Sequence, residues 1–397
     1  MTTTTTTAAT TAEELVATAA NDIRRLAAQA EAERRMPEEL MEALRRARLL
    51  AIYTPRDFGG LELPLPEALR VVEEVSRHDG STGWTVALGV ANGYSTAVLT
   101  RDAAARVLGD GSPLIAGAPA FGVRAVRVDG GYRLTGRWQF NSGAPNADWI
   151  GAPAPLFDSD DSESPRMTPA GPEMVFFFIP RSDAQIVDTW HVTGMRATGT
   201  QDLMVDGVFV PEEMTGGFAL PMGPQAVRDG ALTRLPFLTL FCVTQAPPTC
   251  LGIARRAIDE FREIAPAKAT PFGGPPLSEK PQAQAALARA EALVRSARGY
   301  WYANVDAIWE AAVDGRPLTL DDMASSRIAS LTAVENSVEA VELLWRQAGT
   351  TGIFQTSALE RCWRDVHTAA QHMHVQDGRW ETAGRVMFGL DPGTPLV

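Results

Sequence analysis

The sequence predicts a mostly helical α+β protein, in which an N-terminal helical domain and a C-terminal four-helix bundle flank a central β domain. Three observations predict this order. Apolar residues recur at helical intervals before residue 112. Residues 113–222 are richer in Gly, Pro, Val and Phe and contain short segments that alternate with period two. After residue 222, four long helical runs with short connections indicate a bundle.

The N-terminal domain is predicted over residues 11–112. Residues 1–10 are mainly threonine and alanine, which cannot bury a core, so we expect a disordered tail. Thr11 and Glu14 have the spacing of a capping box and predict the start of a helix. Further along, the pattern predicts a helix over 66–78 and a very apolar helix over 82–99.

The central domain, 113–222, begins with strand-like segments separated by Asp129-Gly130-Gly131, which predicts a hairpin. An acidic stretch rich in Ser and Pro predicts a mobile loop over 157–172. The C-terminal domain, 223–397, contains the predicted helical runs 230–264, 281–314, 320–347 and 357–376.

Composition excludes several classes of function. Lys and Arg total 36 and Asp and Glu total 48, so the formal net charge is −12. Such a chain lacks the basic surface that nucleic acid or an anionic membrane requires. The three cysteines are widely spaced and form no disulfide framework or zinc pattern. We therefore expect a cytoplasmic protein with no signal peptide and no membrane span.

Two strings in the central domain carry a resemblance to a known family. Residues 136–143 (GRWQFNSG) resemble the flavin loop of the acyl-CoA dehydrogenase superfamily, and residues 194–200 (GMRATGT) resemble its second β-domain signature. The superfamily also has this order of a helical domain, a β-barrel or sandwich domain and a four-helix bundle. The resemblance implies an acyl-CoA dehydrogenase-like fold for nearly the whole chain.

The last predicted helix indicates a branch of that superfamily. In common acyl-CoA dehydrogenases, a pair like Arg364-Asp365 is followed by the glutamate that removes the substrate α-proton; here that position is Met373, which has no useful basicity. Four strings resemble instead the oxygenase components of two-component flavin monooxygenases: HDGSTGW (78–84), FNSGAPNADW (140–149), DTWHVTGMRATGTQD (188–202) and RDVHTAAQH (364–372). That branch includes relatives of p-hydroxyphenylacetate hydroxylase, dibenzothiophene monooxygenase and amino-sugar N-oxygenases.

This resemblance implies an enzyme that takes reduced flavin (FMNH2 or FADH2) from a separate reductase. With O2 it would form a flavin C4a-hydroperoxide and oxygenate an electron-rich aromatic, amine or sulfur compound. The superfamily's assembly implies a homotetramer that holds flavin between subunits. Two alternatives remain open: an FAD-linked dehydrogenase of the acyl-CoA type, and a flavin-fold subunit without catalytic activity.

The same resemblance assigns two catalytic residues, Ser142 near the flavin N5 and His372 as acid or base. Its flavin-binding residues are Phe140, Asn141, Ser142, Arg196 and Thr198, with Phe272, Gln284 and Gly349 reaching the flavin of a neighbouring subunit. Its substrate-pocket residues are Trp84, Asn92 and His367. Phenol-hydroxylating relatives often carry a histidine where this chain has Ala91 or Asn92, which leaves the substrate open.

Each of these residues also has an ordinary structural interpretation. Ser142 can satisfy a turn, and His372 can be a core histidine bonded to a carbonyl. His367 fits a structural role as well as a role behind the site. On one helix, His367, His372 and His374 would not share a face, and HExxH spacing is absent from the sequence, so we expect no metal site.

Overall fold

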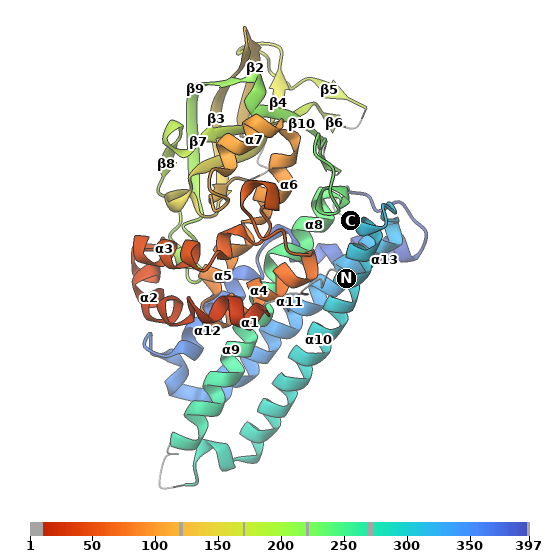
Figure 1. The fold of residues 1–397 in the computed structure, drawn as a ribbon. Coiled ribbons are helices and arrows are strands. Elements are labelled where there is room, and N and C mark those ends of the chain that lie inside the picture. Colours follow the sequence, from red (N-terminus) through yellow and green to blue (C-terminus); the bar gives the residue numbers. More distant parts are fainter. Residues whose placement is uncertain (1–10, 119–121, 170, 220–221, 269–273, 395–397) are drawn as a thin grey trace, which may run out of the picture.

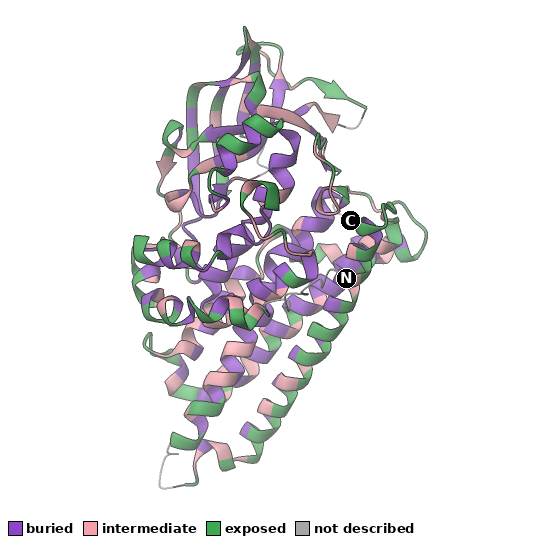
Figure 2. Cartoon of the chain, in the orientation of Figure 1, coloured by how far each residue is buried: buried purple, intermediate pink, exposed green. Residues whose placement is uncertain are grey.

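The computed structural model describes residues 11–118, 122–169, 171–219, 222–268 and 274–394. The predicted tail and Phe272 therefore lie outside the described residues. The sheet occupies one end of the molecule, the long helices of the bundle extend to the other end, and the N-terminal helices lie between them (Figure 1). The buried residues concentrate where these three parts meet (Figure 2).

The N-terminal domain consists of α1 (Ala12–Ala17), α2 (Ala20–Glu33), α3 (Glu38–Arg46), α4 (Leu65–His78), α5 (Gly80–Ala87), α6 (Val90–Tyr94) and α7 (Arg101–Leu108). The capping box of Thr11 and Glu14 is confirmed. The single helix predicted over 82–99 is wrong, because the chain breaks between α5 and α6 and ends in a 3-10 turn. Gly89 and Gly93 pack so closely on the carbonyls of Leu50 and Tyr53 that a side chain at Gly93 would lie 2.4 Å from one of them.

The central domain forms one connected sheet. Its strands are β1 (Ile115–Ala116), β2 (Val123–Val128), β3 (Gly131–Asn141), β4 (Trp149–Phe157), β7 (Met174–Pro180), β8 (Gln185–Val187), β9 (Gln201–Pro211), β10 (Thr215–Ala219) and β11 (Gly223–Pro224). Their order is β11-β10-β7-β4-β2-β3-β9-β8, with β1 beside β4. The hairpin predicted at Asp129-Gly130-Gly131 is confirmed, since Val128 pairs with Gly131. The stretch predicted as a loop contains a small hairpin of β5 (Met167–Thr168) and β6 (Gly171–Pro172).

The C-terminal domain contains α8 (Phe237–Thr244), α9 (Ala246–Ala267), α10 (Pro281–Val313), α11 (Leu320–Ala348), α12 (Ala358–Ala369) and α13 (Gly378–Met387). The helix predicted over 357–376 is too long: α12 ends at Ala369, and His372 has extended backbone angles, φ −63° and ψ 136°. His367, His372 and His374 therefore do not lie on one helix, and helical geometry does not fix the angles between their side chains. Helix α13 lies beyond the last helical run that the sequence predicts.

One stretch of the described residues, Phe237–Ala267, is long and apolar enough to cross a membrane. However, 94% of its most apolar window is buried inside the protein. Helix α9 packs against α4, α11 and α12, so its apolar character is explained by its position at the centre of the fold.

Candidate functional site

Ser142 lies directly after β3, in a turn that faces the N-terminal helices. Gly143 adopts φ +77° and donates its N–H to the carbonyl oxygen of Thr198 over 2.7 Å, which joins the two predicted flavin strings. The indole Nε1 of Trp84 donates a hydrogen bond to Ser142 Oγ over 3.2 Å. The tertiary structure therefore brings Trp84, Ser142 and Thr198 together, as three residues of one cluster.

Hydroxyl groups extend this cluster into the second string. Ser142 Oγ lies 2.9 Å from Thr200 Oγ1, and Thr200 Oγ1 lies 2.7 Å from Thr198 Oγ1. Thr198 Oγ1 in turn donates to the carbonyl oxygen of Met195 over 2.8 Å. Thr200 is not among the site residues that the sequence predicts. The sequence Thr198-Gly199-Thr200 could have indicated it, because Gly199 turns the chain at φ +53° between the two threonines.

Phe140 combines two unusual properties. Its side chain is 66% exposed, and its backbone adopts φ +59°, which costs free energy for a residue other than glycine. The conformation is held by an irregularity in the pairing of β3 with β9 between Trp138 and Asn141, and by a hydrogen bond from the Phe140 N–H to Asp202 Oδ1. A strained backbone that presents an aromatic ring to solvent indicates a binding function.

Asn141 is fully buried beside it. Its Nδ2 donates to the carbonyl oxygen of Trp138 over 2.8 Å. Its buried Oδ1 has no hydrogen-bond partner within the described part of the chain. Because an unpaired buried acceptor is costly, this atom is available to a ligand donor that approaches β3.

His372 lies against the ring of Trp84, at a centroid distance of 5.4 Å and in an edge-on arrangement. Burial, together with the charge of Arg327, lowers the pKa of His372 to about 4. Its buried Nδ1 has no hydrogen-bond partner among the residues that the structure describes. The imidazole is therefore neutral near pH 7 and is a weaker base than a histidine with the ordinary pKa.

Two of the three predicted pocket residues have their contacts elsewhere. His367 Nε2 lies 3.4 Å from Glu342 Oε2, and its ring packs on Trp363 inside the bundle. Asn92 is fully buried, and its Nδ2 donates to the Leu50 carbonyl oxygen and to neighbouring oxygens, which ties α6 to the preceding segment. Of the three, Trp84 is the one that joins the Ser142 cluster.

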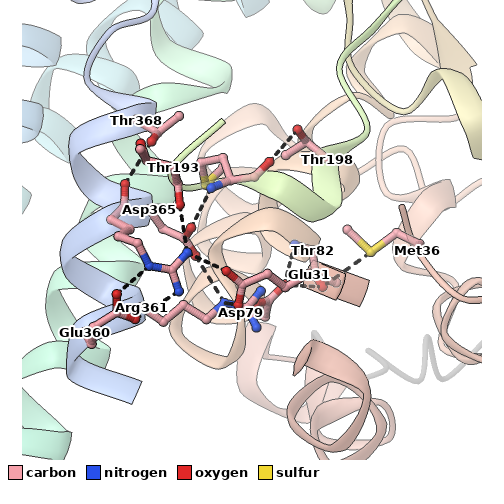
Figure 3. A network of polar contacts seen from close by, with 12 residues as sticks. Glu31, Met36, Asp79, Thr82, Thr193, Thr198, Glu360, Arg361, Asp365 and Thr368 are labelled. Atoms are coloured by element: carbon pink, nitrogen blue, oxygen red, sulfur yellow. Dashed lines mark hydrogen bonds and ion pairs between the residues drawn. The ribbon is translucent and has the colours of Figure 1, made fainter. Parts of the chain in front are cut away.

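Asp365 and Arg361 of α12 form ion pairs and hydrogen bonds at the edge of the site (Figure 3). Asp365 Oδ1 accepts the backbone N–H of Met195 over 2.5 Å, and Asp365 also lies beside Arg361. Arg361 pairs with Asp79, the N-cap of α5, over 2.6 Å. Burial raises the pKa of Asp365 to about 6, while Arg361 opposes that rise. These ion pairs connect α12, α5 and the loop that carries Arg196.

Arg364 holds the same loop from the other side. Its guanidinium donates to the Thr193 carbonyl oxygen over 2.8 Å, and a side chain at Gly194 would lie 2.2 Å from the Arg364 carbonyl oxygen. The loop thus sits directly on α12. Arg196 follows it, and the buried Nε of Arg196 has no hydrogen-bond partner in the described ranges.

The residues expected to reach a neighbouring subunit lie apart from this cluster. Gln284 is in the first turn of α10, where its Nε2 donates to the Ser278 carbonyl oxygen. Gly349 directly follows α11 with φ +53°. These helix ends are at the end of the bundle that points away from the sheet (Figure 1).

Three residues of the two predicted flavin strings carry groups that fit a flavin. Phe140 offers an exposed ring to an aromatic system, Asn141 Oδ1 offers an unused acceptor, and Arg196 offers an unused donor that suits a phosphate.

Met373, at the position of the dehydrogenase base, is 42% exposed and carries a thioether. In the described part of the chain, no group of three or more His, Cys, Asp or Glu residues is placed to hold a metal ion.

Comparisons with known proteins identify the family of this chain. Residues 5–105 match the acyl-CoA dehydrogenase N-terminal domain and residues 244–377 match the acyl-CoA dehydrogenase C-terminal domain. Indole-3-acetate monooxygenase of Pseudomonas putida is 30% identical, covering 91% of this chain and 89% of that protein. The FADH2-dependent resorcinol hydroxylase oxygenase component of Rhizobium sp. is 31% identical, covering 95% and 94%.

Solved structures agree as well. The structure of XiaF from Streptomyces sp. in complex with FADH2 and glycerol superimposes with a TM-score of 0.88 at 26% identity, covering 97% of each chain. These similarities extend over all three domains, and they favour the monooxygenase branch over the dehydrogenase and non-catalytic alternatives. The chain therefore belongs to the acyl-CoA dehydrogenase superfamily, in its branch of flavin-dependent monooxygenases that use reduced flavin and O2.

Proposed function

We propose that this chain is an oxygenase component that adds one oxygen atom to an electron-rich aromatic small molecule. The observation that carries the proposal is the cluster in which Trp84 contacts both Ser142 and His372, with the exposed Phe140 two residues before Ser142 in the chain. The names of the relatives, an indole-3-acetate monooxygenase and a resorcinol hydroxylase oxygenase component, support an aromatic substrate. The second name also supports a separate reductase that supplies the flavin.

In this proposal, Phe140 would pack on the flavin ring, Ser142 would contact its N5 edge and Arg196 would pair with its phosphate. Reduced flavin supplies the activation of O2. Trp84 and His372 would shield the reacting edge from water, since both rings lie at a buried contact. The Nδ1 of His372, which has no hydrogen-bond partner among the described residues, would accept a hydrogen bond from an aromatic hydroxyl or ring N–H of the substrate.

The proposal includes a cytoplasmic homotetramer. Gln284, Gly349 and Phe272 would then approach the flavin of a neighbouring subunit. Exposed apolar side chains at Ile353 and Phe354, close in sequence to Gly349, support burial of that end of the bundle in an assembly. Light scattering of the purified protein would measure the mass, and a monomer that still binds flavin at full affinity would contradict this part.

The test of function uses purified protein, chemically reduced FMN or FAD, labelled ¹⁸O2 and a panel of phenols, indoles and aromatic acids. We expect one labelled oxygen atom in a product from at least one compound, as measured by mass spectrometry. Ser142→Ala should release more hydrogen peroxide per flavin consumed, whereas the exposed Met387→Ala is the matched control. Complete release of peroxide with every compound would contradict the proposed oxygenase.

A further inference from the structure

We infer that a directed chain of hydroxyl groups turns Ser142 into a hydrogen-bond acceptor and thereby makes the site prefer reduced over oxidised flavin. The chain runs from Trp84 Nε1 through Ser142, Thr200 and Thr198 to the carbonyl oxygen of Met195. Its contacts measure 3.2, 2.9, 2.7 and 2.8 Å, so each is a hydrogen-bond distance.

The two ends of the chain decide its direction. An indole nitrogen is only a donor and a backbone carbonyl is only an acceptor, while each hydroxyl has one proton to donate. Thr198 must give its proton to Met195 if that contact is to be filled; Thr200 then donates to Thr198, and Ser142 donates to Thr200. The reverse direction would leave two oxygens 2.8 Å apart with no proton between them. Since Ser142, Thr198 and Thr200 are all at most 9% exposed, water does not readily relieve that repulsion.

The proton of Ser142 is therefore committed to Thr200, and one lone pair of Ser142 is committed to Trp84. Ser142 Oγ is then left with a second lone pair, which can only accept a hydrogen bond. In reduced flavin the N5 atom carries a hydrogen and donates; in oxidised flavin N5 carries none and accepts. Ser142 thus matches reduced flavin and mismatches oxidised flavin. This step rests on the proposed contact between Ser142 and N5.

Thr200 and Thr198 are positioning residues in this scheme, because they act on the flavin through Ser142. An oxidised flavin would have to reverse the hydroxyl chain to receive a proton from Ser142, at the expense of one filled hydrogen bond. A net hydrogen bond of about 1 kcal/mol corresponds to roughly fivefold in a binding constant. That preference suits an enzyme that must release its flavin once it is oxidised.

The experiment is an anaerobic titration of the full-length protein with FMNH2 and, separately, with FMN, with the FAD pair run in parallel. The measured quantity is the ratio of the two Kd values, oxidised over reduced. In Thr200→Val the proton of Ser142 is released, so oxidised flavin should bind more tightly and the ratio should fall roughly fivefold. Thr200→Ser keeps the hydroxyl and should keep the ratio.

Two more variants make the test specific. Thr198→Val frees Thr200 to donate to Ser142, so the ratio of the two Kd values should also fall in this variant. It replaces Thr200→Val in the test if Thr200→Val does not fold. Met387→Ala changes an exposed side chain in α13, outside the hydroxyl chain, and should keep the ratio. Equal ratios in Thr200→Val and Thr200→Ser would overturn the inference alone, whereas a wild-type protein that binds neither reduced flavin would overturn the proposed function itself.

Discussion

The indole nitrogen of Trp84 lies 3.2 Å from the hydroxyl oxygen of Ser142 and donates a hydrogen bond to it. Trp84 belongs to α5 and Ser142 follows β3, so this bond joins the helical domain to the sheet at the candidate site. Trp84 is 7% exposed and Ser142 is 9% exposed, which limits competition from water. This hydrogen bond therefore fixes the spacing between the N-terminal helical domain and the central β domain at the site.

Replacing Ser142 by Ala should destabilise the protein as well as impair the reaction. The change leaves the Trp84 N–H and the Thr200 hydroxyl with one partner fewer in a buried place, which costs roughly 1–3 kcal/mol. Urea unfolding would measure the loss. Ser142→Thr keeps the hydroxyl and should recover most of the stability, so equal loss in both variants would contradict a role for the hydrogen bonds.

Replacing Phe140 by Gly should separate stability from binding. Glycine adopts φ +59° without strain, and the lost side chain is mostly exposed, so unfolding should become about 1 kcal/mol less favourable. The affinity for reduced flavin should fall, because the exposed ring is removed. Thermal unfolding and anaerobic titration test the two effects, and a variant that gains stability with unchanged affinity would remove Phe140 from the flavin site.

Stability should decline as the pH falls below neutrality. Burial lowers the pKa of His372 and of His78 to about 4, and it lowers that of His374 well below its usual value. An unfolded histidine takes up a proton near pH 6.5, so the unfolded state binds more protons between about pH 6.5 and pH 4. The stability that neutral His372 confers is therefore fully present above about pH 6.5 and is lost as the pH falls from 6.5 to about 4.

The variant His372→Gln checks this dependence. In that window the unfolding free energy of the variant should change less steeply with pH than that of the wild type. The slope should fall by up to about 1.4 kcal/mol per pH unit, because one titrating group is gone. His191→Gln removes an exposed histidine and is the matched control. Parallel pH profiles for wild type and His372→Gln would show that this ring remains free to titrate in the folded protein.

Replacing Asp365 by Asn should weaken the junction between α12 and α5. The amide oxygen still accepts the Met195 N–H, but Arg361 loses one of its carboxylate partners in a buried place. Removal of one member of a buried ion pair costs about 3 kcal/mol or more. Chemical denaturation measures it, and Glu39→Gln, in the exposed pair with Arg25, should change stability little.

Several elements followed from local sequence alone. The capping box at Thr11 and Glu14 and the hairpin at Asp129-Gly130-Gly131 depend on residues within a few positions of one another, and both are present in the structure. The long helices α10 and α11 also matched their predicted ranges closely, because their apolar spacing is sustained over many turns. The roles assigned to the site residues remain predictions that the variants above would test.

The two incorrect helix predictions, over 82–99 and 357–376, both arise from contacts between segments that are distant in sequence. The helix predicted over 82–99 is broken where Gly89 and Gly93 approach the backbone of a segment some forty residues earlier. Likewise α12 ends at Ala369, and His372 turns away to pack on Trp84. No local pattern reports such contacts, since the partner is distant in sequence.

The sequence by itself determined the order of the three domains, the family and the two strings that resemble flavin-binding segments, because periodicity and short motifs are local properties. Only the tertiary structure decided that Trp84, Ser142 and Thr200 form one hydrogen-bonded chain and that burial lowers the pKa of His372 to about 4. The direction of a hydrogen bond and the pKa of a buried group depend on which atoms surround them. Those surroundings are created when distant segments exclude water from one another.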